Sequence, residues 1–238
     1  MPYLLGALVL AAGLLLYWEL IVAEGTHLGA GVVIWLYDLV APRYERIKNF
    51  KLDLDDAYVG WPLAVALVNQ ASPRVLDVAA GTGRVARSVL RQVAFTGLVL
   101  NADLSMRMLR EGRPRAAPWP GRTAWLCSPA DRLPFADGVF DAVTCLEAME
   151  FFPRPTAALA ECVRVLQPGG WLIVTNRVGF SARWLPGKTF SRAAFRRRLA
   201  ALPLEAVRVE PWQAEYDLAW ARKRSPGDED ADHSLLSA

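Results

Sequence analysis

The sequence predicts an α/β fold: a doubly wound, mainly parallel seven-stranded sheet that ends in an antiparallel hairpin, preceded by one apolar helix. Five short runs rich in β-branched and other apolar residues alternate with helix-like segments, which is typical of a parallel sheet covered on both faces. These runs lie at 74–79, 97–102, 123–128, 140–146 and 171–175. Only about three residues separate the last two runs, 205–212 and 215–223, which suits a hairpin and is too short for a helical crossover.

The chain begins with an apolar segment, residues 3–23, whose one charged residue is Glu19. As a helix it would be about 31 Å long, close to the roughly 30 Å of a bilayer's hydrocarbon core. Tyr17 and Trp18 fall near its carboxyl end, where aromatic side chains favour the membrane interface. A cleaved signal peptide is the alternative, but no Lys or Arg precedes the run and the run is longer than usual. We therefore expect residues 1–27 to form a membrane anchor.

The positive charges predict the orientation of this anchor. No Lys or Arg occurs before Arg43, and then Arg43, Arg46, Lys48 and Lys51 follow within nine residues. The positive-inside rule places that side in the cytoplasm, so we expect a single-pass membrane protein with its α/β domain in the cytoplasm. A second apolar run, 28–40, is too short to span a bilayer and contains Asp38, which favours an interfacial helix or one packed on the domain.

The remaining elements complete the predicted domain organisation. Helices are expected at 83–93, 104–111, 156–166 and 191–202, and "LQPGGW" (166–171) ends one helix and opens the next strand. Residues 28–73 are expected to form lid and linker helices, 74–224 the α/β domain, and the acidic segment 225–238 a disordered tail.

Composition excludes several classes of function. The net charge of +3 over 238 residues is too small to indicate a nucleic-acid partner. Cys127, Cys145 and Cys162 lie in apolar runs without any C-x-x-C pairing, so we expect reduced thiols packed in a core and no metal site. The two histidines, His27 and His233, fall outside the expected core, which disfavours histidine-based catalysis.

The stretch "RVLDVAAGTGRVARSV" (74–89) joins a strand to a helix through a glycine-rich turn of the kind that holds a nucleotide-like ligand. A P-loop is disfavoured because Arg84 and Val85, and not Lys and Ser or Thr, follow Gly83. The dinucleotide fingerprint G-x-G-x-x-G/A is satisfied by 81–86, and Asp103 lies 20 residues further on, where a carboxylate would bind a ribose diol. This pattern alone leaves a nicotinamide cofactor open.

Three observations favour a different ligand. Asp77 lies before the turn, where a carboxylate suits an ammonium or sulfonium group better than a pyrophosphate. The segment "ADRLPFADGVFDAV" (130–143) links the third and fourth strands in one compact unit, and the hairpin is foreign to a dinucleotide-binding domain.

Four ordered motifs, "VLDVAAGTGR", "LVLNADLSMRML", "ADRLPFADGVFDAV" and "ECVRVLQPGGWLIVTN", resemble those of the class I S-adenosylmethionine-dependent methyltransferases. The similarity covers about residues 37–223, and it is strongest to the group that includes ubiquinone/menaquinone C-methyltransferases and bacterial phospholipid N-methyltransferases. It implies a Rossmann-like methyltransferase fold, with S-adenosylmethionine as the cofactor.

The resemblance implies a cofactor site. Asp103 would accept hydrogen bonds from both ribose hydroxyls and Leu104 would pack on the adenine, although Asp103 could instead only cap the following helix. The implied cofactor-binding residues are Asp77, Ala79, Gly81, Gly83, Asp103, Leu104, Ala130 and Asp131.

The chain departs from the family pattern at two positions. Pro129 stands where relatives carry Asp or Asn beside the adenine, so the Ala130 amide or Asp131 would have to serve instead. Phe151 stands where some relatives place a His near the substrate. No catalytic base is evident. Glu147 and Glu150 are weak candidates at the end of the fourth strand, and solvated carboxylates without a catalytic role are the alternative.

"YDLVAPRYERI" (37–47) resembles the tyrosine-containing lid of this group, so Tyr37 and Tyr44 are candidates to cover the cofactor or substrate, or else residues of a membrane interface. The basic and aromatic segment 182–199 is either a surface for anionic headgroups or an ordinary solvated helix. We therefore expect methyl transfer to a small hydrophobic or membrane-resident acceptor, such as a phospholipid or quinone. The alternatives are a tethered binding protein without activity and an NAD(P)-dependent oxidoreductase.

Overall fold

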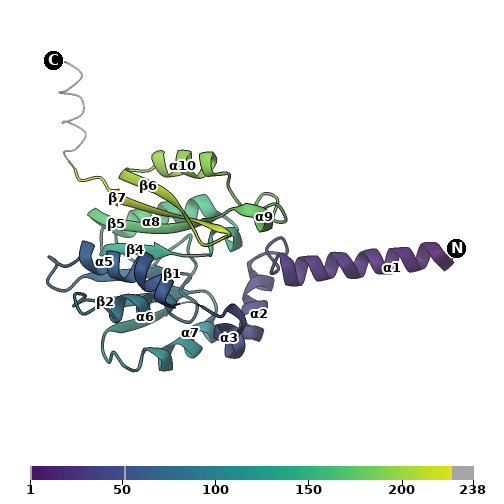
Figure 1. Ribbon diagram of the computed structural model, residues 1–238, viewed down its shortest axis with the longest axis horizontal. Coiled ribbons are helices and arrows are strands. Elements are labelled where there is room, and N and C mark those ends of the chain that lie inside the picture. The colour runs from purple at the N-terminus through teal and green to yellow at the C-terminus, as the bar shows by residue number, and fades with distance from the viewer. Residues whose placement is uncertain (1, 51, 227–238) are drawn as a thin grey trace, which may run out of the picture.

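The computed structural model describes residues 2–50 and 52–226, and its centre is one seven-stranded sheet of order β3-β2-β1-β4-β5-β7-β6 (Figure 1). The strands are β1 (Arg74–Val78), β2 (Leu98–Asp103), β3 (Thr123–Cys127), β4 (Phe140–Cys145), β5 (Leu166–Arg177), β6 (Leu204–Trp212) and β7 (Tyr216–Lys223). The neighbours among β1 to β5 pair in parallel, and β7 is antiparallel to both β5 and β6. The predicted mainly parallel sheet with a terminal hairpin is confirmed.

Helices cover both faces of the sheet because successive side chains of a strand point to opposite faces. Val75 of β1 packs in one apolar cluster with α5 (Trp61–Ala66) and α6 (Arg84–Leu90). Its neighbour Leu76 packs in a second cluster with α8 (Pro155–Val165) and α10 (Arg192–Ala200). A further helix, α7 (Met106–Gly112), lies beside β2 and β3. The doubly wound arrangement follows from these two clusters.

Two predicted boundaries differ from the observed ones by more than two residues, and the others agree within two. The helix expected at 83–93 ends at Leu90. The strand expected at 171–175 begins earlier, at Leu166, because "LQPGGW" continues the strand through an irregularity. Phe140 pairs with Leu166 but Ala142 pairs with Trp171, so the extra residues loop out, helped by the left-handed backbone of Gly169 (φ 73°).

At the amino terminus, α1 (Pro2–Tyr17) continues into a π-helical turn (Trp18–Val22) and projects away from the body of the protein (Figure 1). Residues 3–22 form one helix long and apolar enough to cross a membrane, and only 6% of its most apolar window is buried against the rest of the structure. The helix is therefore not part of the core. By length and composition a signal sequence has the same properties.

Short helices follow α1: the first of them lie over the carboxyl ends of the parallel strands, and the last two pack against α6. They are α2 (Ala30–Val40), a 3-10 turn (Ala41–Arg43), α3 (Tyr44–Lys48), α4 (Leu52–Asp55) and a π-helical turn (Asp56–Gly60). α2 contacts α7, so residues 28–40 pack on the domain, which is one of the two possibilities expected for them.

The remaining short helices are two 3-10 turns (Arg113–Ala116 and Met149–Phe151) and α9 (Gly179–Ala182). Cys145 and Cys162 are buried as expected, but the prediction is wrong for Cys127, which is exposed because its strand β3 is the edge of the sheet. Residues 227–238 of the predicted disordered tail, including His233, lie outside the described residues.

Candidate active site

The carboxyl ends of β1, β2 and β4 border a cavity of about 300 Å³, which the amino-terminal helices α2 and α3 close from the other side. Such a crevice at the ends of parallel strands is the usual place for a ligand in this class of sheet. Ten residues singled out from the sequence line it: Asp77, Ala79, Gly81, Asp103, Leu104, Ala130, Asp131, Glu147, Tyr37 and Tyr44. Gly83 and Glu150, also singled out, are not among its lining residues.

The turn after β1 has a left-handed backbone at Ala79 (φ 56°), Gly81 (φ 55°) and Gly83 (φ 75°). A Cβ on Gly81 would lie 3.3 Å from the Met108 side chain, so the glycine keeps the backbone open toward the cavity. A Cβ on Gly83 would come within 2.6 Å of the Trp125 ring. Gly83 thus permits the close packing of α6 on the sheet, whereas Gly81 shapes the cavity wall.

Asp103 ends β2 and is held by two backbone N–H groups. Its Oδ2 accepts a hydrogen bond from the Gly81 nitrogen at 2.8 Å, and its Oδ1 accepts one from the Ser105 nitrogen at 2.8 Å. Burial raises the pKa of this carboxyl and the backbone hydrogen bonds partly offset that effect. Both oxygens retain lone pairs, so the fixed carboxylate can still accept hydrogen bonds from a ligand. The helix cap predicted as an alternative role belongs to Ser105, whose Oγ accepts from the Met108 nitrogen at 3.0 Å.

Asp77, in β1, carries the second buried carboxylate of the cavity. It is 2% exposed, and its Oδ1 accepts a hydrogen bond of 2.6 Å from the Thr144 hydroxyl on β4. Burial raises its pKa to about 7, although the Thr144 hydrogen bond and the charge of Arg84 act in the opposite direction. A carboxyl in this state binds a cation readily, because a positive ligand compensates for the lost hydration of the ionised form.

Arg84, at the start of α6, is a lining residue that the sequence analysis used only to exclude a P-loop. It is 8% exposed and lies 2.9 Å from Glu147 Oε1 and 3.4 Å from Asp55 Oδ2. Its guanidinium stacks over the Phe50 ring at 4.5 Å. The signal for its burial is an arginine in the first turn of a helix whose other residues are mostly apolar or small, "RVARSVL". It ties the amino-terminal segment to the end of β4.

The two carboxylates considered as bases differ in position. Glu147 lines the cavity, but its Oε1 is held by Arg84 and by the Gln213 amide at 3.2 Å. Glu150 is 1% exposed, with its Oε1 accepting a 2.7 Å hydrogen bond from the Tyr216 hydroxyl. The expectation of a solvated carboxylate is wrong for Glu150. Burial raises its pKa and the Tyr216 hydrogen bond lowers it.

At the other end of the cavity, Pro129 and Ala130 follow β3 and form part of the wall, together with Ser128. The Asp131 carboxylate is engaged by Arg154, whose Nη2 lies 2.8 Å from its Oδ2. The Ser128 hydroxyl donates to the Pro129 carbonyl oxygen at 3.3 Å, and the Ala130 backbone follows directly in the same wall. The sequence analysis missed Ser128 because it has no place in the family pattern quoted above.

An aromatic cluster closes the cavity over Asp103. The Tyr37 ring packs edge-on against Phe151 with centroids 5.6 Å apart and tilts against Tyr44 at 5.8 Å. The Tyr37 hydroxyl donates to Glu24 Oε2 at 2.7 Å. Phe151, the departure from the family His, thus packs against the aromatic cover.

Two polar contacts hold this cover in place. The Ser105 hydroxyl donates to Asp38 of α2. Glu45 of α3 accepts from the Thr82 hydroxyl and from Arg87 Nη2, the latter at 2.8 Å. The cover is therefore fastened to the turn after β1 and to the start of α7, which are the two segments that Asp103 joins.

Residues 76–174 match the family of methyltransferase domains described as Methyltransf_11. Over 181 residues, 76% of this chain and 68% of the relative, the sequence is 32% identical to the ubiquinone/menaquinone biosynthesis C-methyltransferase UbiE of Burkholderia orbicola (strain MC0-3). The chain belongs to the class I S-adenosylmethionine-dependent methyltransferases. This membership sets aside the oxidoreductase alternative.

Solved structures agree on the fold of this methyltransferase. A methyltransferase from Aquifex aeolicus described as SAM-dependent superposes with a TM-score of 0.60 at 17% identity, covering 76% of this chain and 98% of its own. The [4+2]-cyclase SpnF superposes with a TM-score of 0.66 at 20% identity, covering 83% and 97%. At these identities the likeness concerns the fold alone, and the second protein shows that the fold also serves other chemistry.

We predict that affinity for S-adenosylmethionine rises by on the order of tenfold between pH 5.5 and 7.5. The reason is that Asp77, with a pKa of about 7, must ionise to attract a cationic ligand, while the ligand's sulfonium is charged throughout this range and its amino group is mainly protonated. Calorimetric titration at several pH values measures this. Asp77→Asn should bind more weakly at pH 7.5 and lose most of the pH dependence. An unchanged pH profile in that variant would contradict the assignment.

We predict that Asp38→Ala raises the rate of cofactor dissociation about fivefold, the equivalent of the ~1 kcal/mol that one hydrogen bond contributes. The substitution removes the contact between α2 and Ser105 but leaves Ser105 free to cap α7, so the melting temperature should stay within about 2 °C of the native value. A stopped-flow chase with unlabelled cofactor gives the rate. Asp53→Ala, at an exposed position of α4, is the control. Equal rates in the two variants would contradict a covering role for α2.

Proposed function

We propose that this methyltransferase transfers the methyl group of S-adenosylmethionine to a small hydrophobic acceptor that resides in the membrane. The observation that carries this proposal is that the sheet side of the cavity carries the carboxylates of Asp77 and Asp103, whereas apolar side chains line its α2 side. Asp77 and Asp103 belong to the sheet, whereas Ala30, Val33 and Ile34 belong to α2. A ligand that spans the cavity would therefore meet acceptors and negative charge at the sheet and an apolar wall at α2.

The residues at the sheet end fit the cofactor. Asp103 offers fixed carboxylate oxygens to a diol, Asp77 offers negative charge to an ammonium or sulfonium, and Gly81 leaves the turn without a Cβ on the cavity side. When bound, S-adenosylmethionine supplies an electrophilic methyl group, so the protein needs no nucleophile of its own. The role of these residues is to bind and orient, and the role of the aromatic cover is to exclude water.

The acceptor must supply the nucleophile. The residues that line the cavity at the end of β4 favour an acceptor that ionises easily or that needs no general base. Glu147 is the carboxylate at the end of β4 that lines the cavity, and it is paired with Arg84 at 2.9 Å. Paired in this way, it is better suited to positioning Arg84 and Phe50 against the cavity than to removing a proton. Tyr37 and Phe151, whose rings meet edge-on, supply an aromatic wall for an acceptor ring or chain.

The proposed membrane anchor supports a lipid-phase acceptor. Residues 3–22 are long enough to cross the bilayer, and Arg43, Arg46 and Lys48 follow on the side that the positive-inside rule places in the cytoplasm. An anchored enzyme gains most when its acceptor is confined to the same bilayer, because both then share a thin layer at high effective concentration.

The experiment that tests this proposal uses membranes containing the full-length protein, open on the cytoplasmic side, with methyl-labelled S-adenosylmethionine and Asp103→Ala as the control. We expect label in the organic phase that falls at least a hundredfold in the control, because the ribose contacts are lost. Mass analysis then names the acceptor. Label confined to the aqueous phase would contradict a lipid acceptor, and bound cofactor without label in either phase would favour an inactive tethered binder.

A further inference from the structure

The helix α2 is apolar on two opposite faces. At 100° per residue, Ala30, Val33, Ile34 and Tyr37 share the face that lines the cavity. Trp35 and Leu39 fall on the opposite face, where they are 58% and 60% exposed. A surface helix normally carries polar residues on its outer face. The apolar outer face of α2 therefore indicates a binding partner that covers it.

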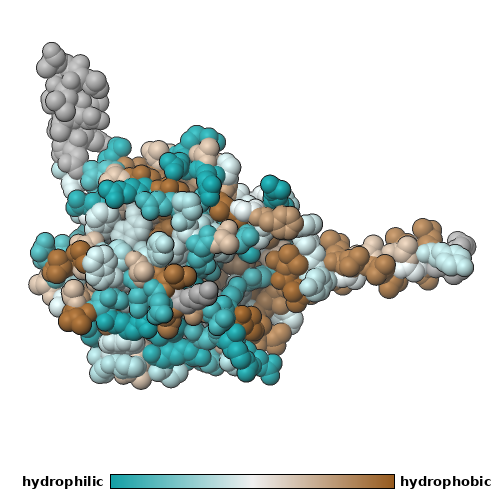
Figure 2. All heavy atoms as spheres, viewed as in Figure 1, coloured by the Kyte–Doolittle hydropathy of each residue, from teal (hydrophilic) through white to brown (hydrophobic). Residues whose placement is uncertain are grey.

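Other exposed apolar side chains lie around this face. They are Leu28, before α2, Ile47 in α3, and Phe180 and Trp184 in and after α9. Figure 2 shows hydrophobic residues gathered where α1 meets the body of the protein, over α2 and α9. Together with Trp35 and Leu39 we call these residues the docking surface.

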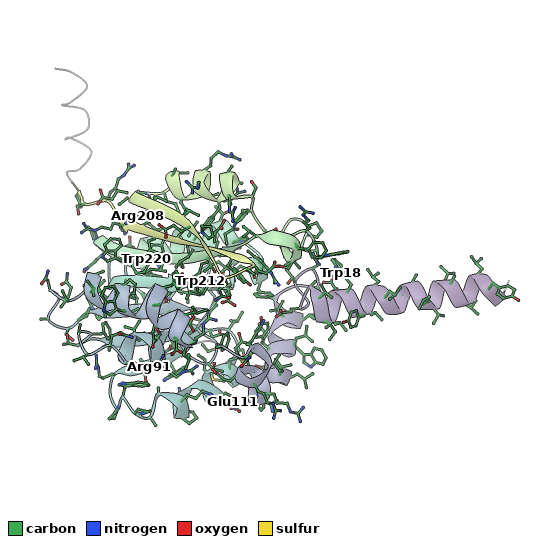
Figure 3. All side chains as sticks on the ribbon, in the orientation of Figure 1. Trp18, Arg91, Glu111, Arg208, Trp212 and Trp220 are labelled. Atoms are coloured by element: carbon green, nitrogen blue, oxygen red, sulfur yellow. The ribbon has the colours of Figure 1, made fainter. Side chains whose placement is uncertain are left out.

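Polar and aromatic contacts in the segment between α1 and α2 fix the docking surface relative to α1. The Glu19 carboxylate accepts from the His27 nitrogen at 3.1 Å and pairs with His27 Nδ1 at 3.2 Å. The His27 ring stacks on Trp18, which lies at the root of α1 (Figure 3), with centroids 5.3 Å apart. Its Nε2 lies 3.3 Å from the Pro186 carbonyl oxygen, next to Trp184. The helix α1 is therefore joined to both sides of the docking surface.

Basic side chains surround the apolar ones. Arg43 and Arg46 are exposed beside Ile47, and Arg183 is exposed beside Trp184. By contrast, three arginines of the predicted basic segment 182–199 are engaged within the domain: Arg192 with Asp217 at 2.8 Å, Arg196 with the Val209 oxygen at 2.9 Å, and Arg198 over Phe190 at 4.1 Å. Arg183, at the amino-terminal end of that segment and near α1, is therefore one of its exposed positive charges.

We infer that the docking surface rests in the lipid interface, so that α2 separates the bilayer from the methyl-transfer cavity. Tryptophans with flanking arginines are the side chains that favour the boundary between acyl chains and anionic headgroups. The surface is continuous with α1, and a domain held at the root of a spanning helix must present that side to the membrane. The inference rests on the proposed function and gives the acceptor a route: from the bilayer past α2, whose inner face is the cavity wall.

The test measures contact with lipid directly. A bimane fluorophore is placed on Leu39→Cys in the full-length Cys127→Ser protein, reconstituted in phosphatidylglycerol–phosphatidylcholine vesicles with or without brominated acyl chains. We expect bromination to quench at least half of the fluorescence. The control is Val93→Cys, 99% exposed on the loop between α6 and β2, which lies at the opposite end of the parallel strands and should not be quenched.

Equal quenching at the two positions would overturn the inference. The inference would also be overturned if, in detergent, the label at position 39 became shielded from solvent as the protein concentration rises, because a second copy would then cover the surface.

A functional readout is independent of the label. Trp35→Ser with Leu39→Ser should lower methyl transfer to the bilayer acceptor at least fivefold and leave the affinity for S-adenosylhomocysteine within twofold. The control pair, Val65→Ser with Val68→Ser, should leave both methyl transfer and that affinity unchanged. Quenching without any methyl transfer would count against the proposed function only, and lipid methylation without quenching against this inference only.

Discussion

The site depends on one interaction, the pair of hydrogen bonds that the Asp103 carboxylate accepts from the backbone nitrogens of Gly81 and Ser105. They join the turn after β1 to the start of α7, two segments that approach each other because β1 and β2 are adjacent and parallel. The left-handed turn and the Ser105 cap are then fixed in one geometry. A carboxylate already held by two N–H groups does not need to reorganise when a ligand arrives, and this is what makes it a good partner for a diol.

The cover of the cavity is built on the same two segments. Ser105 contacts Asp38 of α2 and Thr82 contacts Glu45 of α3, so the amino-terminal helices rest on the groups that Asp103 orders. The helix α2 is too short to span a bilayer, but this coupling gives its apolar residues two roles. Its inner face is a wall of the cavity and, in our proposal, its outer face contacts the membrane. Cofactor binding, closure and access of the acceptor would then depend on one set of contacts.

Local pattern was sufficient for the sheet, its hairpin and ten of the cavity residues, because strand periodicity and the glycine-rich turn are encoded by neighbouring residues. It was insufficient where long-range packing decides. Glu150 is buried because Tyr216, 66 residues away, supplies a hydrogen bond, and Arg84 is buried because Asp55 and Glu147 come from distant segments. The roles of Gly83 and Cys127 likewise depend on neighbours across the sheet: a tryptophan ring in one case and an open edge in the other.

The most direct test of the central claim is a competition titration of the full-length protein with S-adenosylhomocysteine and NADH. We predict one S-adenosylhomocysteine bound per chain, displaced by S-adenosylmethionine and unaffected by NADH, with binding weakened by more than 2 kcal/mol in Asp103→Ala because a charged hydrogen-bonding partner is lost. Binding that Asp103→Ala leaves intact, or that NADH displaces, would show that the cavity over Asp103 is not the S-adenosylmethionine site.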